Sequence, residues 1–451
     1  MPTRKILGLA ERERTSDRAP APARWTRKGT ETETQGDRRP SDAALLVVGI
    51  AWCPAGSAVR RPELTPLRCR PQPTGPTPLL SILVADGCGR YALPGGGLHG
   101  VTGDQAAMEG GGFYNRNSAL QAAGTALLSP IWARACETIE LGDGPVRILD
   151  IASSQGRNSM APMAMAIETV RRRAGTNRAI EIIHTDLPSN DFTTLFEAVL
   201  TDPSSYLIGR TGVFPAAIGR SYFEPLVPPQ TVHLAWNGWS MQWMSHLPEL
   251  APDHVLAGMS EEADLLAAVA RAQTEDWAMF LALRARELLP SGRLLTAFTA
   301  RTEAETGWEW LLGELWASIL DPVADRVLDA GEAERMTIPI GLRRLDDVRR
   351  PFSSGGAFEG LIAEQIELER VDDPHWAEYE RTGDGNTFAT RHAEATRAWA
   401  GPTLARALNP EHNAPATLDL LFARHAERLA VSPRRHRPYM AFALLVKASE
   451  A

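Results

Sequence analysis

Residues 146–159 read VRILDIASSQGRNS, an apolar run that passes into a turn of small residues. A helical stretch at 162–175, PMAMAIETVRRRAG, follows it, and 179–187, AIEIIHTDL, is a second apolar run. Two apolar runs on either side of a periodic segment that stops at a glycine predict a strand, a helix and a strand. A βαβ unit requires parallel strands, so this stretch predicts an alternating α/β fold on a parallel sheet.

The alternation continues to the end of the chain. Helical patterns recur at 118–138, 191–203 and 274–300, and Pro290 and Gly292 stop the last one before another strand. Further strands are expected at 231–237, 360–371 and 438–448. We therefore expect a Rossmann-like sheet with helices on both faces and a cofactor-binding core at about 140–300 plus the late strands.

Two mainly helical segments, at about 303–358 and 376–431, are too long for ordinary loops. We expect them to form a helical cap over the carboxyl ends of the strands, where open α/β sheets bind ligands. Pocket residues are expected near 308–316 and 336–340.

The composition excludes several classes of protein. With 44% hydrophobic and 23% charged residues and a net charge of −8, the 451-residue chain has no basic footprint for nucleic acid or an anionic membrane surface. The longest apolar run, 43–52, is about half of the roughly 20 residues that span a bilayer, and the N-terminus lacks a signal-peptide core. We expect a cytoplasmic protein without nucleic-acid or membrane partners.

The first 107 residues differ from the rest. They are rich in Arg, Pro and Gly and hold 15 Lys or Arg against 10 Asp or Glu, whereas the remainder holds 32 against 45. Such composition rarely forms a packed core. We expect residues 1–107 to be either a disordered tail or a misassigned extension before a natural start at Met108, and 108–451 to be the functional domain.

Four cysteines are too few and too irregularly spaced for a disulfide framework or a zinc site, so we expect reduced, unpaired thiols. They are Cys53, Cys69, Cys88 and Cys136.

The end of the second predicted strand carries a lone acid, Asp186, about 36 residues after Asp150. A carboxylate in this position can accept hydrogen bonds from both hydroxyls of a ribose. The first turn contains one glycine, Gly156, and so lacks the glycines of a pyrophosphate cradle. An ordinary βα turn is an equally open interpretation of it, but together with Asp186 the turn favours a nucleoside without phosphates, such as S-adenosylmethionine.

The residues after Asp186 are expected to start the next helix and to hold the acid in place. Ser189 or Asn190 can cap that helix, Asp191 suits its first turn, and Pro188 fixes the entry.

Six motifs, in this order and spacing, resemble the SABATH family of plant-type salicylate, benzoate and jasmonate carboxyl methyltransferases. The motifs are FYNRNSALQ (113–121), DIASSQGRNS (150–159), HTDLPSNDF (184–192), IGRSYFEPLVP (218–228), VHLAWNGWSMQWMS (232–245) and EDWAMFLALRARELLPSGR (275–293). The resemblance covers residue 109 to the end. It implies a class I methyltransferase sheet, S-adenosylmethionine as cofactor, a small carboxylic acid as substrate and a homodimer.

The resemblance also implies roles for single residues. It places Gln121 and Trp243 on the substrate carboxylate. The implied cofactor-binding residues are Tyr114, Ser118, Asp150, Gly156, Asn158, Asp186, Leu187, Ser221 and Tyr222. An amide N–H and an indole N–H are neutral donors that can orient a carboxylate. The carboxylate is ionised at neutral pH, so in-line methyl transfer to it needs no general base.

Simpler interpretations apply to several of these side chains. Trp236, Trp239 and Trp243 recur at helical spacing, which is typical of a core stripe, and only the resemblance singles out Trp243. His184 and His233 lie in apolar strands, where histidines are most often buried and hydrogen-bonded.

This sequence departs from the family's pattern at several positions. Ala152, Arg116 and Gln242 replace the usual Cys or Gly, Lys and His, and the last of these helps to set ring preference. Glu334, Met336 and Thr337 stand where some relatives carry a magnesium-linked Asp-x-Phe-Asn segment, so we predict no required metal.

Three functions stay open. The chain is a carboxyl methyltransferase, an N-methyltransferase of a purine-like heterocycle, or a non-catalytic ligand-binding protein on the same fold. Gln121 and Trp243 favour the first, because a ring nitrogen does not need a paired carboxylate cradle, and the full cofactor set weakens the third.

Overall fold

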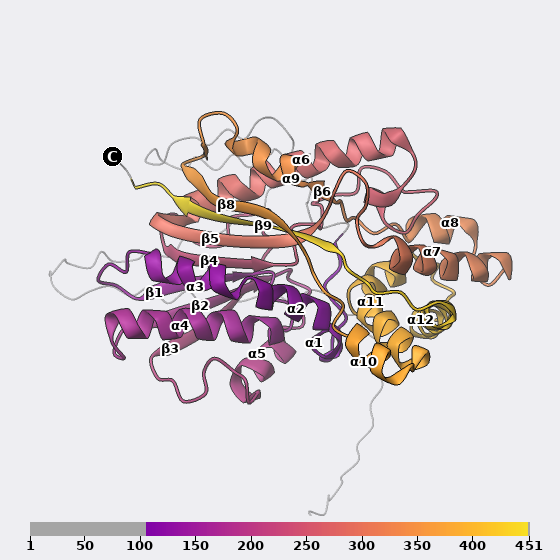
Figure 1. Ribbon diagram of the computed structural model, residues 1–451, viewed down its shortest axis with the longest axis horizontal. Coiled ribbons are helices and arrows are strands. Elements are labelled where there is room, and N and C mark those ends of the chain that lie inside the picture. Colours follow the sequence, from indigo (N-terminus) through magenta and orange to yellow (C-terminus); the bar gives the residue numbers. More distant parts are fainter. Residues whose placement is uncertain (1–104, 450–451) are drawn as a thin grey trace, which may run out of the picture. The chain divides into compact units, whose positions relative to one another are not determined.

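The computed structural model describes residues 105–449, and expectations for residues 1–104, including Cys53, Cys69 and Cys88, lie outside this part of the chain (Figure 1). The described part makes tertiary contacts from its first residue, because the Gln105 side chain donates to the carbonyl of Met244 at 2.7 Å. Cys136 is a buried free thiol. None of the described helices is long and apolar enough to cross a bilayer.

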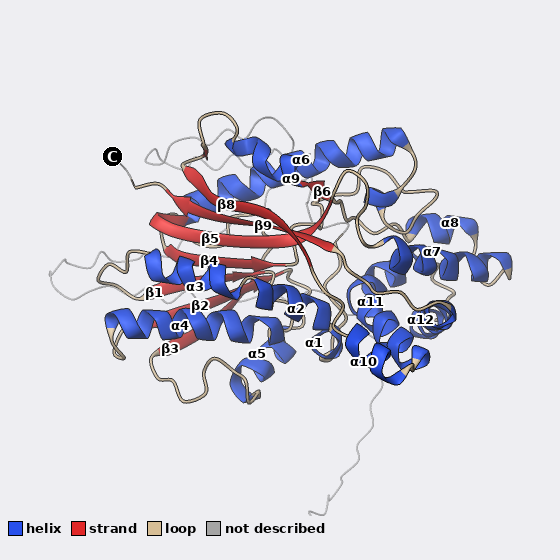
Figure 2. Cartoon of the chain, viewed as in Figure 1, coloured by secondary structure: helices blue, strands red, loops and turns tan. Residues whose placement is uncertain are grey.

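A mixed sheet forms the centre of this domain (Figure 2). Its strands are β1 (Val146–Ile151), β2 (Ile180–Asp186), β3 (Val213–Gly219), β4 (Val232–Gly238), β5 (Leu288–Arg301), β6 (Arg343–Arg344), β7 (Ala357–Phe358), β8 (Leu361–Arg370) and β9 (Tyr439–Lys447). Their order is β3-β2-β1-β4-β5-β9-β8-β7, and β6 pairs with β5 outside this path. Strands β1 to β5 run parallel, whereas β9 is antiparallel to β5 and β8.

The α-helices alternate with the strands in the first part of the domain, and the later ones fall mainly within the two long insertions. They are α1 (Phe113–Asn117), α2 (Ala119–Leu127), α3 (Ser129–Thr138), α4 (Met160–Ala174), α5 (Phe192–Thr201), α6 (Ala263–Glu287), α7 (Glu309–Ala324), α8 (Ala330–Arg335), α9 (Leu345–Arg349), α10 (Trp376–Thr382), α11 (Gly385–Ala407) and α12 (Ala414–Val431).

The unit β1-α4-β2 has the predicted parallel geometry, with Val146 opposite Ile180 and Asp150 opposite His184. Helix α4 ends before Gly175, whose φ of 80° requires the left-handed region. The predicted alternating α/β class is confirmed.

Both faces of the sheet are covered by helices, as predicted. Val146 and Ile148 of β1 pack in one hydrophobic cluster with residues of α3 and α4. Leu149 and Ile151 point to the other face and pack in a second cluster with residues of α6. Alternate side chains of a strand face opposite sides, so burial on both faces explains why β1 carries apolar residues on each of them.

Three differences from the sequence-based elements have local causes. The helix expected at 118–138 breaks at Leu128 into α2 and α3, because Pro130 suits only the first turn of a helix. Strand β3 was not predicted, since it is an edge strand with Pro215 at its centre and partly exposed positions. Helix α6 ends at Glu287, and β5 takes up Pro290 and Gly292 through a register shift.

Most helices of the two late insertions lie together, whereas α9 lies beside α6 (Figure 1). Helices α11 and α12 pack against each other, and α7 packs on α12. They adjoin the ends of β4 and β5, because residues of α7 and α11 share a cavity with residues that follow β4.

The turn between β5 and α7 fixes the cap to the last strand through Gly307. Its φ is +80°, and a Cβ there would lie 2.4 Å from the Arg437 carbonyl oxygen, in the chain that enters β9. We expect Gly307→Ala to lower the free energy of unfolding by more than the about 1–2 kcal/mol that a left-handed backbone costs alone. Urea unfolding measures the difference.

Gly383→Ala is the matched control for Gly307→Ala. Gly383 has a φ of +67°, and a Cβ added to it would meet no atom within 4 Å, so only the backbone cost applies. Equal losses in the two variants would show that the contact with Arg437 does not constrain Gly307.

Candidate active site

Three cavities adjoin one another at the carboxyl ends of β1, β2 and β4, and Tyr114 and Trp239 line all of them. The turn cavity is lined by Asp150, near the end of β1, and by residues of the turn that follows (152–159), including Asn158. The acid cavity is lined by Asp186, Leu187 and Tyr222, among others. The tryptophan cavity is lined by Trp239, Trp243, Trp308 and Trp399 with apolar neighbours.

The first turn has a strained backbone. Ala152 and Ser154 have φ values of 59° and 49°, which non-glycine residues rarely adopt outside functional sites. Gly156 has a φ of 83°, and a Cβ on it would lie 2.5 Å from Leu195 Cδ1. Gly156 therefore lets α5 approach the turn from behind, without itself being part of the three cavity walls.

Helix α1 is tied to this turn by Asn115. Its side-chain nitrogen donates to the carbonyl of Gln155 at 2.8 Å, and its oxygen accepts from the backbone N–H of Arg157 at 3.2 Å. Asn158, further along the turn, donates to the Ser118 hydroxyl at 3.1 Å. Ser118 thus supports Asn158 from behind the turn cavity, whereas Asn115 is a supporting residue that the sequence reasoning missed.

Asp150 is buried and bonded to a second buried group. One carboxylate oxygen lies 2.7 Å from His184 Nδ1, and His184 Nε2 lies 2.8 Å from the Tyr206 hydroxyl. The prediction of a hydrogen-bonded buried histidine is confirmed for His184. His233 is also buried, and its Nδ1 accepts from the backbone N–H of Arg147 at 3.1 Å.

Asp186 joins the end of β2 to the first turn. Its two carboxylate oxygens accept from the backbone N–H groups of Leu187 and Ser154, each at 2.8 Å. Burial raises the pKa of Asp186 to about 6, although both N–H groups act in the opposite direction. Burial, and then the Asp186 charge, also raise the pKa of Tyr114.

Ser221 and Tyr222 follow β3. The Tyr222 hydroxyl donates its one proton toward the carbonyl oxygens of Ser240, at 3.0 Å, and Trp243, at 3.3 Å, so this side chain supports the loop that carries Trp243. The Ser221 hydroxyl accepts from the backbone N–H of Phe223 at 3.3 Å and stands behind the acid cavity.

The helix cap expected at Ser189 or Asn190 is wrong. Asp191 is the N-cap of α5 and accepts from the backbone N–H of Thr194 at 3.0 Å. The Asn190 amide reaches back to the carbonyl of Ser154 at 2.8 Å. A capping oxygen bonds the N–H two or three residues further on, which suits Asp191 and releases Asn190 for a tertiary contact.

Asp191 also holds the N-terminal helix in place. Its carboxylate accepts from the backbone N–H of Gly111 at 2.8 Å, just before α1. Tyr114, which lines all three cavities, is therefore carried by a five-residue helix that has little stability alone and is held by tertiary contacts.

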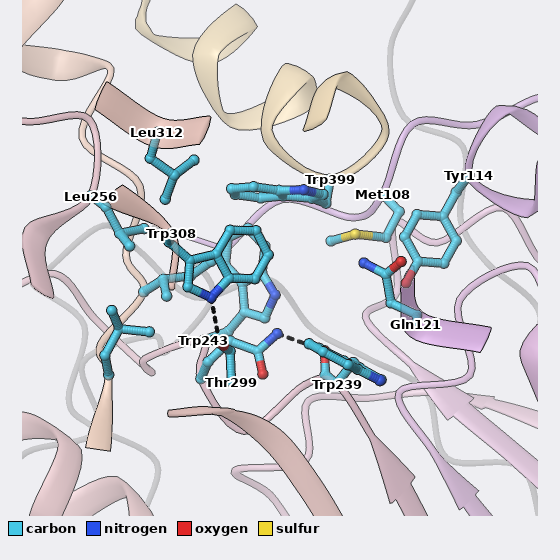
Figure 3. A pocket seen from close by; sticks show the side chains of 13 residues that line it. Met108, Tyr114, Gln121, Trp239, Trp243, Leu256, Thr299, Trp308, Leu312 and Trp399 are labelled. Atoms are coloured by element: carbon cyan, nitrogen blue, oxygen red, sulfur yellow. Dashed lines mark hydrogen bonds between the residues drawn. The ribbon is translucent and has the colours of Figure 1, made fainter. Parts of the chain in front are cut away.

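The tryptophan cavity contains both residues implied for the substrate carboxylate (Figure 3). The side chains of Gln121, from α2, and Trp243, from the loop after β4, point into it. No charged side chain is among the described residues that line it. Trp308 Nε1 already donates to the Thr299 hydroxyl at 2.6 Å, so it is not a free donor.

The three tryptophans of the expected helical stripe do not lie on a helix. Trp236 lies in β4 and packs edge-to-face on Trp132, with ring centroids 5.2 Å apart. Trp239 follows β4 with a φ of 60°, and its buried indole nitrogen has no hydrogen-bond partner within the described chain. The helical spacing of the three tryptophans gave no indication that Trp239 lines all three cavities.

A glycine on α2 makes room for Trp239. A Cβ on Gly124 would lie 2.5 Å from Trp239 Cζ2.

The sequence reasoning also missed Met108 and Trp399, while Trp308 and Ile340 lie in the expected pocket segments and line the tryptophan cavity. Within residues 105–449, no group of three His, Cys, Asp or Glu side chains is placed to hold a metal.

Comparison with known proteins gives relatives of low identity. The chain is 27% identical over 250 residues to Methyltransferase FUS9 of Gibberella fujikuroi, which covers 54% of this chain and 66% of that protein, slightly under two thirds. It is 26% identical over 340 residues to salicylate carboxymethyltransferase of Clarkia breweri, covering 70% of this chain and 90% of the relative.

A solved structure described as loganic acid methyltransferase with SAH matches the fold with a TM-score of 0.63 and 18% identity. The match covers 76% of this chain and 99% of the other. The family model described as SAM dependent carboxyl methyltransferase matches residues 104–448. The chain therefore belongs to the family of S-adenosylmethionine-dependent carboxyl methyltransferases.

Proposed function

We propose that the protein transfers a methyl group from S-adenosylmethionine to the carboxylate of a small aromatic or apolar acid, giving a methyl ester. The observation that carries this proposal is the pairing of Gln121 and Trp243 in a tryptophan-walled cavity whose described lining has no charged group. Neutral donors orient an anion without neutralising it, which leaves it nucleophilic.

The acid and turn cavities fit the cofactor of this family. Asp186 presents a carboxylate to the acid cavity for the ribose hydroxyls, with Leu187 and Tyr114 as neighbours in the same wall. The buried Ser154 hydroxyl has no partner within the described chain and offers a further polar contact there. S-adenosylmethionine supplies a methyl group on a positively charged sulfur.

The residues of the chain contribute position and exclusion of water. Gln121 lines both the turn cavity and the tryptophan cavity, so it stands where the two ligands would meet. The indoles of Trp239, Trp308 and Trp399 cover the acceptor side and lower the local dielectric constant. Transfer between an anion and a cation removes charge, and a dry site favours such a step.

A buried hydrogen-bond acceptor in the tryptophan cavity narrows the class of acid that we propose as substrate. The Gln242 amide donates to the Trp239 carbonyl at 2.7 Å, which leaves its oxygen buried without a partner in the described chain. An acid with an O–H or N–H on its ring would satisfy that oxygen. The relatives named for salicylate and loganic acid support a small acid as substrate. A cytoplasmic location and a homodimer stay predictions.

The substrate assignment is tested with labelled S-adenosylmethionine and a panel of benzoate, salicylate, 4-hydroxybenzoate, indole-3-acetate, cinnamate, a fatty acid and a purine. We expect label in methyl esters, with the hydroxylated or N–H-bearing aromatic acids ahead of benzoate because of Gln242. Label on the purine alone would establish the N-methyltransferase, and no label on any compound would favour a ligand-binding protein.

Two variants test the carboxylate donors. Trp243→Phe keeps an aromatic ring and Gln121→Leu keeps similar volume, but each removes an N–H. Loss of one such hydrogen bond costs about 1–3 kcal/mol, so kcat/KM should fall by roughly 5- to 150-fold. Trp316→Phe, outside the described lining of the cavity, is the matched control and should stay near wild type. Equal rates in all three variants would exclude the paired cradle.

The raised pKa of Asp186 predicts a pH dependence of cofactor binding. Only the ionised carboxylate accepts fully from two ribose hydroxyls, so affinity for S-adenosylhomocysteine should be complete well above the pKa of about 6. It should fall as the pH drops through this value, by at most about tenfold per pH unit. Isothermal titration measures the affinity across this range.

Asp186→Asn is the control for this titration, because the amide has nearly the same shape and does not titrate. Its affinity should be lower at neutral pH and independent of pH in the acidic range. A wild-type affinity that does not change through pH 6 would remove Asp186 from the cofactor site.

A further inference from the structure

A fourth cavity lies on the α6 side of the domain and shares only Leu342 with the described walls of the tryptophan cavity. We name it the arginine cavity, because Arg301, Arg343 and Arg344 line it. The wall from α6 holds four apolar side chains, Leu266, Val269, Ala270 and Trp277, together with the polar Gln273 and Thr274. The cavity thus combines cationic and apolar walls at a place that the methyl transfer does not use.

Arg343 is the buried cation of this cavity, with 2% of its surface exposed. Its guanidinium donates to the carbonyl of Met241 and, at 2.9 Å, to that of Gln273, while Nε has no partner in the described chain. No Asp or Glu of residues 105–449 forms an ion pair with it within 4.0 Å. Burial lowers its pKa to about 10, as expected for a charge with little compensation.

The other charged groups that line the cavity form no ion pair with Arg343 and have partners of their own. Arg344 is paired with the exposed Glu303 at 3.2 Å, and Arg301 donates to the backbone carbonyl of Thr302 at 3.2 Å. Asp347 is the one carboxylate in the described lining, and it is paired with Arg350.

Asp276 lies behind Arg343 and is engaged by the backbone N–H of Ser245 at 2.8 Å, outside the described cavity lining. Burial raises the pKa of Asp276, and the charge of Arg343 acts against this rise without an ion pair between the two groups. The balance at the cavity is therefore positive.

We propose that the arginine cavity is a second ligand site, which binds a small organic anion with an apolar body. The anionic group would lie against the guanidinium groups of Arg301, Arg343 and Arg344, and the apolar body against the wall from α6. Arginines bind carboxylate, sulfonate and phosphate oxygens through several N–H groups, and a partly desolvated arginine does so with little loss of hydration.

The position of Arg343 connects this site to the substrate loop. Its guanidinium holds the carbonyl of Met241, two residues before Trp243. The neighbouring Gly341 N–H donates to the carbonyl of Gln242 at 3.0 Å, and Ile340 forms a β-bridge with Trp243. A ligand that accepts a hydrogen bond from the Arg343 guanidinium therefore competes with the backbone carbonyls that position the segment of Trp243.

Benzenesulfonate is a suitable probe, because it has the proposed shape and no carboxylate to methylate. Isothermal titration into the full-length protein saturated with S-adenosylhomocysteine should show binding. We expect Arg301→Gln, which removes a cation, and Thr274→Asp, which adds an anion at an exposed lining position, each to weaken it about tenfold or more. The two substitutions lie on different elements, β5 and α6, and both make the cavity less positive, so weaker binding in both separates loss of the site from misfolding.

Met279→Asp is the matched control for Thr274→Asp, since it places the same charge on an exposed position of α6 outside the described cavity lining. It should leave the affinity unchanged, and so should Trp243→Phe. Absence of binding, equal weakening by Met279→Asp, or loss in Trp243→Phe would each overturn the proposal. Binding of inorganic phosphate but not of benzenesulfonate would overturn the apolar half of the site.

Discussion

The hydrogen bond from the Ser154 backbone N–H to the Asp186 carboxylate is the contact on which the rest of the site depends. Ser154 has a φ of 49°, a conformation that costs on the order of 1–3 kcal/mol and persists only when its surroundings hold it. Asp186, at the end of β2, accepts from its N–H, and Asn190, in the loop that follows, donates to its carbonyl, so Ser154 is held from both sides. The same acid that is proposed to bind the cofactor thus also shapes the turn.

The sequence predicted the sheet more completely than the site. Buried parallel strands such as β1 and β4 carry apolar residues on both faces, so their sequences indicate strands without any tertiary knowledge. Strand β3 does not, because an edge strand with Pro215 lacks both continuous burial and a full set of backbone donors. Its existence follows from the pairing partner, β2, and not from its own residues.

Among the site residues, Trp239 and Asn190 have positions that could not be predicted from the sequence, because they depend on tertiary contacts. The spacing of Trp236, Trp239 and Trp243 is compatible with a helix, and nothing local reveals that the chain leaves β4 at Gly238 with a left-handed residue. Room for the indole is supplied by Gly124, more than a hundred positions earlier. Asn190 was expected to be the helix cap because its actual partner, the carbonyl of Ser154, is distant in the sequence and has no local signal.

The carboxylates around the three cavities lie on the side proposed for the cofactor, where the turn cavity also has Arg157. Asp150 and Asp186 line the cavities proposed for the cationic cofactor, and the described lining of the tryptophan cavity is uncharged. An arginine in that last cavity would bind a carboxylate more tightly but would also stabilise it before reaction, raising the barrier to transfer. The buried cation Arg343 instead stands behind the loop of Trp243, where its N–H groups fix backbone carbonyls. Arginine thus holds the loop that carries Trp243, and only neutral groups are left to contact the proposed acid.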